Sequence, residues 1–229
     1  MTIIENEDLM PAILEKKLKN LIVRNQKLFF VHIPKNAGTT IMRTVFEKNI
    51  SGHITAPTVN CYKKYSNYKN FAFCRDPFDR FISVYLWRLR KDELVQTIPI
   101  EEVIERLSDE HIQQPTKYGW TNHNNKLDRM FLTQASWMNE NTTFVGRVEK
   151  TNKDILKLKK VYGLDFPWTK TEQRRHENKA KRQGPQAAQT RTLVTGILND
   201  SPSLRNSFFD YYIKDYEKFG YNIPKGIKI

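Results

Sequence analysis

Short apolar runs alternate along the chain with stretches of helical periodicity. An apolar run rich in β-formers covers 27–33, and apolar residues then recur at helical spacing over 39–46. The same order repeats with an apolar run at 70–74 and an amphipathic stretch at 78–89, and a third strand-like run covers 143–148. Strands that alternate with helices predict an α/β fold, in which helices flank a central parallel β-sheet.

Capping and turn residues set the ends of the other predicted helices. These helices cover 97–107, 125–132, 151–163 and 201–216. Thr151 and Asp154 have the spacing of a capping box, and Gly163 ends the same helix. Ser201 and Pro202 supply a cap and a first-turn proline for the last helix.

The first residues differ from the rest of the chain in their pattern. They are mostly polar, and Leu14, Leu18 and Leu21 recur at helical spacing, which predicts an N-terminal helical arm over 1–26. The alternation of strands and helices begins after this arm. Because 229 residues is the length of one domain, we expect 27–229 to form a single domain.

The composition is that of a globular protein with a large positive charge. Hydrophobic residues make up 39% of the chain, which excludes the disordered and low-complexity classes. The excess of 38 Lys and Arg over 25 Asp and Glu gives a net charge of +13 and predicts an anionic partner. Cys61 and Cys74 are too few for a disulfide framework, and no apolar run has the length of a membrane span. We therefore expect a cytoplasmic protein without a signal peptide or membrane anchor.

One segment stands apart by its charge. Residues 169–191 contain seven basic side chains: Lys170, Arg174, Arg175, Lys179, Lys181, Arg182 and Arg191. Only two acidic side chains accompany them, at Glu172 and Glu177. We interpret this segment as a mobile basic loop, since chain of globular character continues on both sides of it.

The predicted loop at 34–38 carries the strongest candidate chemistry. A buried strand that leads through a glycine-containing loop into a helix points backbone N–H groups and the positive end of the helix dipole at one place. Lys35 adds a mobile charge there, and Gly38 lets the backbone approach an anion closely. Thr39 and Thr40 add hydroxyl donors. The pattern predicts a phosphate or sulfate site, although the lysine precedes the glycine and the order is therefore not that of a Walker A loop.

Two motifs resemble those of a known enzyme family. The loop and helix start, Pro34-Lys-Asn-Ala-Gly-Thr-Thr40, resemble the 5′-phosphosulfate loop of sulfotransferases that use 3′-phosphoadenosine 5′-phosphosulfate (PAPS). Arg75-Asp-Pro-Phe-Asp-Arg-Phe-Ile-Ser83 resembles the 3′-phosphate motif of the same family. The chain is most similar to the carbohydrate sulfotransferases that include heparan sulfate 2-O-sulfotransferase and bacterial relatives, over about 28–221. This resemblance implies a single-domain, P-loop-like sulfotransferase fold.

The resemblance also implies a role for each matching residue. Lys35 is the catalytic cation, which neutralises charge that develops on the departing phosphate. The residues expected to bind the donor PAPS and its product 3′-phosphoadenosine 5′-phosphate (PAP) are Pro34, Lys35, Asn36, Ala37, Gly38, Thr39, Thr40, Arg75, Ser83 and Lys181. Within this set, Arg75 and Ser83 are assigned to the 3′-phosphate. Lys181 represents the basic segment, of which Lys179 and Arg182 are equal candidates.

Transfer to a sugar hydroxyl also needs a base, because the hydroxyl loses its proton as it attacks. His53, in the segment Ser51-Gly-His-Ile-Thr55, resembles the histidine proposed as base in the 2-O-sulfating relatives and titrates near neutral pH. Glu47 and Glu149 are held as alternative bases. We interpret His32, on the first strand, as a buried structural residue.

The sequence therefore favours a PAPS-dependent sulfotransferase that acts on a carbohydrate, which the net charge suggests is acidic. Two other classes stay open: a phosphate-loop kinase, and a non-catalytic binder of nucleic acid or polyanions. The absence of a recognisable nucleic-acid motif argues against a nucleic-acid partner. No metal-ligand spacing is present, and sulfuryl transfer from PAPS needs no metal. The few cysteines and the polar N-terminal arm favour a bacterial or viral enzyme; the oligomeric state is not predicted.

Overall fold

The computed structural model describes residues 12–23, 26–48, 52–112, 115–116, 119–120 and 126–228, with only the backbone for 93, 109, 115–116, 119–120 and 170–183. The chain divides into two compact units that interleave along the sequence. The first unit comprises Met1–Arg75, Lys117–Gly119 and Ser136–Lys179. The second comprises Asp76–Thr116, Trp120–Ala135 and Ala180–Ile229.

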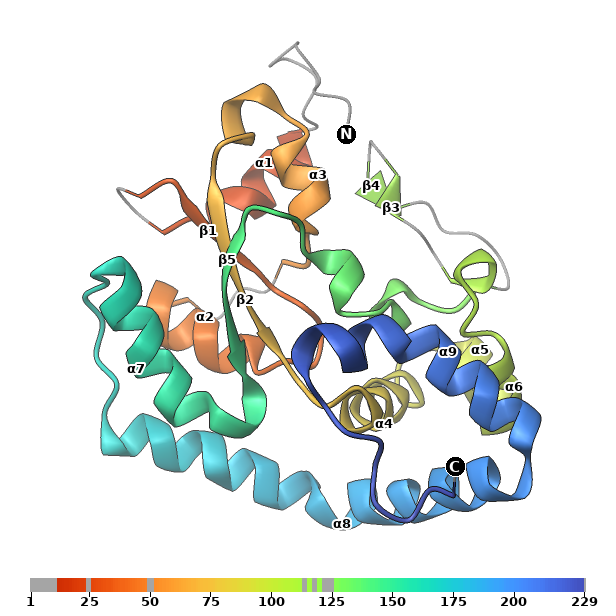
Figure 1. Ribbon diagram of the computed structural model, residues 1–229. Helices are drawn as coiled ribbons and strands as arrows, with labels where there is room; N and C mark the ends of the chain where they lie inside the picture. Colours follow the sequence, from red (N-terminus) through yellow and green to blue (C-terminus); the bar gives the residue numbers. More distant parts are fainter. Residues whose placement is uncertain are drawn as a thin grey trace. The chain divides into compact units, whose positions relative to one another are not determined.

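A parallel β-sheet forms the centre of the first unit (Figure 1). Its strands are β1 (Leu28–Val31), β2 (Lys69–Cys74) and β5 (Thr142–Arg147), paired in the order β1-β2-β5. Every residue of β1 is buried, as expected for a strand of a covered parallel sheet. The three strands and their parallel pairing confirm the predicted α/β fold class.

Aromatic side chains build the core around this sheet. Phe30 and Phe71 face each other in the β1–β2 register, and their rings stack with centroids 5.1 Å apart. Phe73 of β2 is fully buried, and its ring occupies the space beside Gly146 of β5, where an added Cβ would lie 2.5 Å from Cε1 of Phe73. Gly146 therefore permits the close approach of the phenyl ring to the edge strand.

Helices and short 3₁₀ turns complete the first unit. They are α1 (Ala12–Lys19), α2 (Gly38–Phe46), α3 (Ala56–Asn60), η2 (Lys63–Tyr65), η6 (Val148–Lys150) and α7 (Thr151–Tyr162). Helix α7 packs on β5, and Phe46 of α2 stacks on Phe30 of β1. The predicted helices at 39–46 and 151–163 are confirmed.

The second unit is helical around an aromatic core. Its elements include α4 (Pro77–Arg88), α5 (Glu93–Thr97), α6 (Ile100–Glu105), η3 (Asp109–His111), η4 (Arg129–Phe131) and α9 (Pro202–Phe219). The short strands β3 (Pro115–Thr116) and β4 (Gly119–Trp120) pair with each other, and η5 (Ala135–Trp137) lies at the border between the units in sequence. Phe78, Phe81 and Phe208 are fully buried, and Ser201 caps α9 as predicted.

The prediction of one helix over 125–132 is wrong for the residues described. The chain forms only the 3₁₀ turn η4 there, because Arg80 of α4 engages its carbonyl groups. The guanidinium of Arg80 is fully buried and donates to the carbonyl oxygens of Met130, at 2.6 Å, and Leu132, at 2.9 Å. Those carbonyls therefore accept hydrogen bonds from a side chain of another helix instead of from the backbone N–H groups of a helix of their own.

Three other predictions need correction. The helix predicted at 97–107 is shorter than expected: it forms as α6 over Ile100–Glu105 with Pro99 at its N-cap, and α5 ends before it at Thr97. The proposed capping box at Thr151 is not formed, because the Asp154 carboxylate accepts a hydrogen bond from the N–H of Arg147 at 2.8 Å. Residues 170–200 form the helix α8 (Lys170–Asp200) where a mobile loop was predicted. Lys, Arg, Glu and Gln lose little side-chain freedom in a helix, so a charge run of this composition folds readily as one.

Candidate functional site

The loop after β1 has an unusual backbone. Lys35 has φ 67° and Ala37 has φ 58°, so two residues other than glycine lie in the left-handed region within three positions. This conformation costs roughly 1–2 kcal/mol for each such residue and needs support from its surroundings. Alternation between left-handed and right-handed backbone conformations turns successive N–H groups toward one side, which creates a concavity of the kind that binds anions.

Asn36, between these two residues, provides that support. Its side-chain amide is buried and donates to the carbonyl oxygen of Phe73 on β2 at 2.7 Å. Its backbone N–H donates to the carbonyl of Ile33 at 3.3 Å. The sequence placed Asn36 among donor-binding residues; in the structure its amide joins the loop to the central strand of the sheet.

Helix α2 begins at the end of this loop with an uncompensated positive end. Ala37, at the N-cap, makes no side-chain capping bond, and the first turn of α2 contains no acidic residue. The N–H groups of Thr40 and Ile41 both return to the carbonyl of Ala37, at 2.9 and 3.1 Å. The helix dipole is therefore open to an external anion, with the hydroxyls of Thr39 and Thr40 in its first turn.

Gly38, the first residue of α2, lies directly against the ring of His32. A Cβ atom added to Gly38 would lie 1.6 Å from Nε2 of His32, much closer than atoms can approach. The sequence explained this glycine by the approach of an anion to the backbone. In the structure the imidazole of His32 already fills the space that a side chain at this position needs.

His53 lies beside His32 in the same unit. Its Nδ1 atom is 2.8 Å from the carbonyl oxygen of His32, and the two imidazole centroids are 4.2 Å apart. A carbonyl oxygen only accepts hydrogen bonds, so Nδ1 of His53 carries the hydrogen of this bond, and in the neutral tautomer Nε2 carries the lone pair. The edge of Trp137, a fully buried side chain, borders the ring at 6.3 Å. His53 is partly exposed, which a general base requires.

The two histidines differ in their environments. His32 is only 5% exposed, and burial lowers its pKa well below 6.5, with a further contribution from the charge of His53. His32 is therefore a neutral imidazole at physiological pH, which confirms the interpretation of this residue as buried. Its contacts with Gly38 and His53 could not be predicted from the sequence. The periodicity of strands and helices does not reveal which loop lies against the end of a strand.

The other predicted site residues lie on identifiable elements. Arg75 directly follows β2 and is partly exposed, and Ser83 lies on α4 of the second unit. Lys181 belongs to α8, but its side chain lies outside the part of the chain that the structure describes. Glu47 ends α2 with a left-handed C-cap, and Glu149 lies in η6 after β5. Glu47 is thus at the opposite end of α2 from Gly38, roughly 13 Å away at 1.5 Å per residue.

Among the described residues, no three His, Cys, Asp or Glu side chains lie close enough together to hold a metal ion. Across the same ranges, no helix combines the length and the apolar character needed to span a membrane.

A parallel strand, a left-handed loop and a helix N-terminus without a side-chain cap form an arrangement in which α/β proteins bind oxyanions through the backbone. The sequence model of the sulfotransferase family matches residues 19–222, and the chain belongs to this family. It is therefore a sulfotransferase, as the two motifs indicated. No curated protein and no solved structure matches the chain.

Proposed function

We propose that this sulfotransferase moves a sulfuryl group from PAPS to a hydroxyl of a carbohydrate. The open N-terminus of α2, with its left-handed loop and without an acidic first turn, is the observation that carries the proposal. The donor and product are polyanions, and this is the kind of backbone surface that binds phosphate. The residues present thus fit the donor that the family typically uses.

The chain's own groups divide the work of donor binding. The N–H groups of the loop and of the first turn of α2 hold the 5′-phosphate, with the hydroxyls of Thr39 and Thr40 as further donors. Lys35 reaches the leaving oxygen and balances the negative charge that grows there as the bond to sulfur breaks. Arg75 binds the 3′-phosphate that distinguishes PAPS and PAP from ADP. Ser83 and Lys181 remain predictions from the sequence.

His53 acts as the base in this proposal. Its Nε2 lone pair accepts the proton of the acceptor hydroxyl while the hydroxyl oxygen bonds to sulfur in a direct, in-line displacement. The bond from Nδ1 to the His32 carbonyl fixes the ring and the tautomer for that task. Glu47 fits poorly as an alternative because it lies at the far end of α2, whereas Glu149 stays an alternative.

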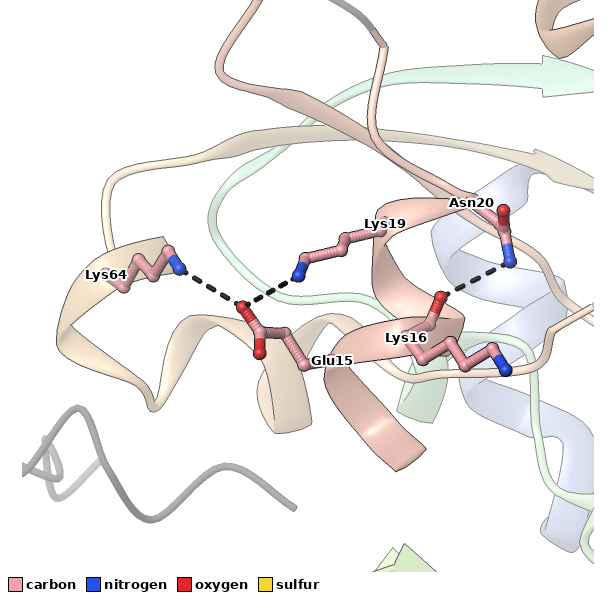
Figure 2. Close-up of polar contacts among 5 residues, drawn as sticks. All are labelled: Glu15, Lys16, Lys19, Asn20 and Lys64. Carbon is pink, nitrogen blue, oxygen red and sulfur yellow. Dashed lines mark hydrogen bonds and ion pairs between the residues drawn. The ribbon is translucent and has the colours of Figure 1, made fainter. Parts of the chain in front are cut away.

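Basic side chains near His53 support an acidic acceptor. Helix α1 carries Lys16, Lys17 and Lys19, and a Cβ built on Gly52, the neighbour of His53, would lie 3.7 Å from the Cβ of Lys17. Glu15, the one acidic residue of α1, contacts both Lys19 and Lys64, at 3.6 and 3.2 Å (Figure 2). Hydrogen bonding to Lys64 and the charge of Lys19 lower the pKa of Glu15. Because Glu15 is paired with two lysines, the surface beside His53 stays positive, which suits an anionic carbohydrate.

The compartment is part of the same proposal. Neither Cys61 nor Cys74 forms a disulfide, and Cys74 is buried at the end of β2. Cysteines outside disulfides are usual in a reducing compartment, so we place the activity in the cytoplasm.

The test is a calorimetric titration of the purified chain with PAP, ADP and 5′-AMP in the absence of metal. PAP should bind tightly, and the affinity should fall at least tenfold when the 3′-phosphate is missing. The Arg75→Ala variant should lose this preference for PAP. Equal weak binding of all three nucleotides would refute the proposal and favour a polyanion binder, whereas a preference for ADP over PAP would favour a kinase.

A further inference from the structure

The imidazole of His32 joins two parts of the site that the sequence treats separately. On one side it lies on Gly38, the first residue of the helix whose N-terminus is open to an anion. On another side it meets the ring of His53, with centroids 4.2 Å apart and planes at 43°. Its remaining face stacks on Phe30 of β1, with centroids 5.3 Å apart and planes at 16°. One buried ring therefore touches both the anion loop and the base.

This packing leaves the ring little room to move. Phe30 is itself buried between β1, β2 and α2, since its ring stacks on Phe71 at 5.1 Å and on Phe46 at 6.2 Å. A closely packed interior transmits displacement instead of absorbing it. A shift of the α2 N-terminus toward His32 must therefore move the His32 ring, and this ring bears on His53.

We propose that His32 is a positioning residue that couples the N-terminal turn of α2 to His53, and that Gly38 is required because of His32 and not because of the bound anion. The consequence of this coupling rests on the proposed function: the base is correctly placed when the anion site is occupied. Its packing basis is independent of that function.

The competing explanation of Gly38 makes the opposite prediction. If the glycine is needed so that the ligand can approach the backbone, a methyl group at this position blocks binding whatever residue stands at 32. If the imidazole is the obstacle, shortening residue 32 makes room for the methyl group and restores binding.

Two substitutions of His32 form a matched pair for this test. His32→Ala removes every ring atom and so empties the space over Gly38. The amide of glutamine extends to the position of Nε2, so His32→Gln keeps that space filled. Each is made alone and together with Gly38→Ala, and Gly196→Ala is the control because its Cβ would meet no atom within 4 Å.

The first measurement is PAP affinity by calorimetry together with the midpoint of thermal unfolding. Gly38→Ala alone should weaken PAP binding at least tenfold and lower the unfolding midpoint. In Gly38→Ala/His32→Ala, the PAP affinity should return to within threefold of that of His32→Ala alone, and the two unfolding midpoints should agree within error. Gly38→Ala/His32→Gln should stay impaired. A folded Gly38→Ala/His32→Ala protein that fails to bind PAP, or a Gly38→Ala protein that behaves as wild type, would overturn the proposal.

The second measurement follows the His53 ring directly by nitrogen NMR of protein labelled in histidine, with His53→Ala to assign its signals. Wild type should show the Nδ1–H tautomer, and PAP should shift the His53 signals. In His32→Ala this shift should fall to less than half, although PAP affinity stays within threefold of wild type. An unchanged response to PAP in His32→Ala would show that His32 does not couple the two parts.

These readouts separate the inference from the proposed function. If wild type does not bind PAP, the proposed function fails while the coupling is still tested without nucleotide. Gly38→Ala should then shift the His53 signals and lower the unfolding midpoint, and Gly196→Ala should do neither. An unshifted His53 spectrum in folded Gly38→Ala protein would reject the coupling by itself.

Discussion

Two helices of this molecule begin after a parallel strand, and their N-termini are built in opposite ways. Helix α2 starts at an alanine in the left-handed region, without a side-chain cap and without an acid in its first turn. Helix α4 starts at Asp76, whose carboxylate accepts from the N–H of Asp79 at 2.9 Å, and has Pro77 at its first position. Asp79 adds a second carboxylate in the first turn and pairs with Arg191.

The difference shows how local charge separates a structural helix start from a binding one. Both helices have the same strand–loop–helix pattern of apolar positions, so hydrophobic periodicity treats them alike. Asp76 and Asp79 satisfy the dipole of α4 from within the chain. At α2 the corresponding positions are neutral, as expected for a helix start that binds an anion.

The largest expected effect concerns the charge beside the open N-terminus. Lys35→Ala should reduce the rate of sulfuryl transfer by about 100- to 1,000-fold, because it removes a group that acts mainly in the transition state. Kinetics under single-turnover conditions, together with PAP titration, measure the effect. Lys48→Ala is the matched control, since Lys48 lies beyond the other end of α2 and donates to Asn20 at 3.1 Å. Equal losses of rate and PAP affinity in Lys35→Ala would contradict the transition-state role.

A carboxylate introduced at α2 should make it resemble α4. Ala37→Asp places a negative charge at an N-cap whose left-handed backbone aspartate tolerates, and PAP affinity should fall at least tenfold, or about 1.4 kcal/mol. Ala37→Asn has nearly the same shape without the charge and should retain most of the affinity. If both variants bind PAP equally, charge at this position does not distinguish the two helix starts.

The neutral histidine under α2 should make stability depend on pH. Above pH 6.5 neither folded nor unfolded His32 binds a proton, whereas below it only the unfolded chain does, because burial lowers the folded pKa. The free energy of unfolding should therefore fall by about 1.4 kcal/mol per pH unit below 6.5 until the lowered folded pKa is reached. Denaturant unfolding at pH 5.5 and 7.5 checks this. His32→Gln should lose that part of the pH dependence; an identical slope in both proteins would be evidence that His32 is protonated when folded.

Removing the cap of α4 should have the smallest effect and no direct effect at α2. Asp76→Ala should cost about 1 kcal/mol and lower the unfolding midpoint by about 2–4 °C. The control variant, Asp210→Ala, removes an exposed carboxylate of α9. Surface substitutions usually change the free energy of unfolding by about 0.5 kcal/mol or less, so its midpoint should stay within about 1 °C of wild type. A midpoint unchanged in Asp76→Ala would show that the cap contributes nothing measurable.

The elements around β1 and β2 were predictable because local sequence decides them. The four buried residues of β1 form one continuous apolar run, and the apolar residues of α4 recur at helical spacing. The turn at 129–131 was not predictable, because the buried guanidinium of Arg80 decides it from about fifty positions away. Helix α8 was missed for a different reason, since high charge was taken as a sign of a loop although its residue types favour a helix.

The candidate site was only partly predictable. The order of residues in 34–40 identified the loop, and the family match confirms what those motifs indicated about the class of enzyme. The reason for Gly38 was not accessible, because its neighbour His32 is separated from it by a loop whose path depends on two left-handed residues. Nothing in a single sequence marks Lys35 and Ala37 as left-handed.

The hydrogen bond from Asn36 to the Phe73 carbonyl has a consequence for the kinetics of ligand capture. Because a side chain of the protein holds the curled loop on the sheet, this loop has its shape before a ligand arrives. Little conformational entropy remains to be lost on binding, and encounter is not followed by a slow rearrangement of the loop. Anions should therefore enter in one fast phase whose rate rises linearly with their concentration and is set by diffusion and long-range attraction.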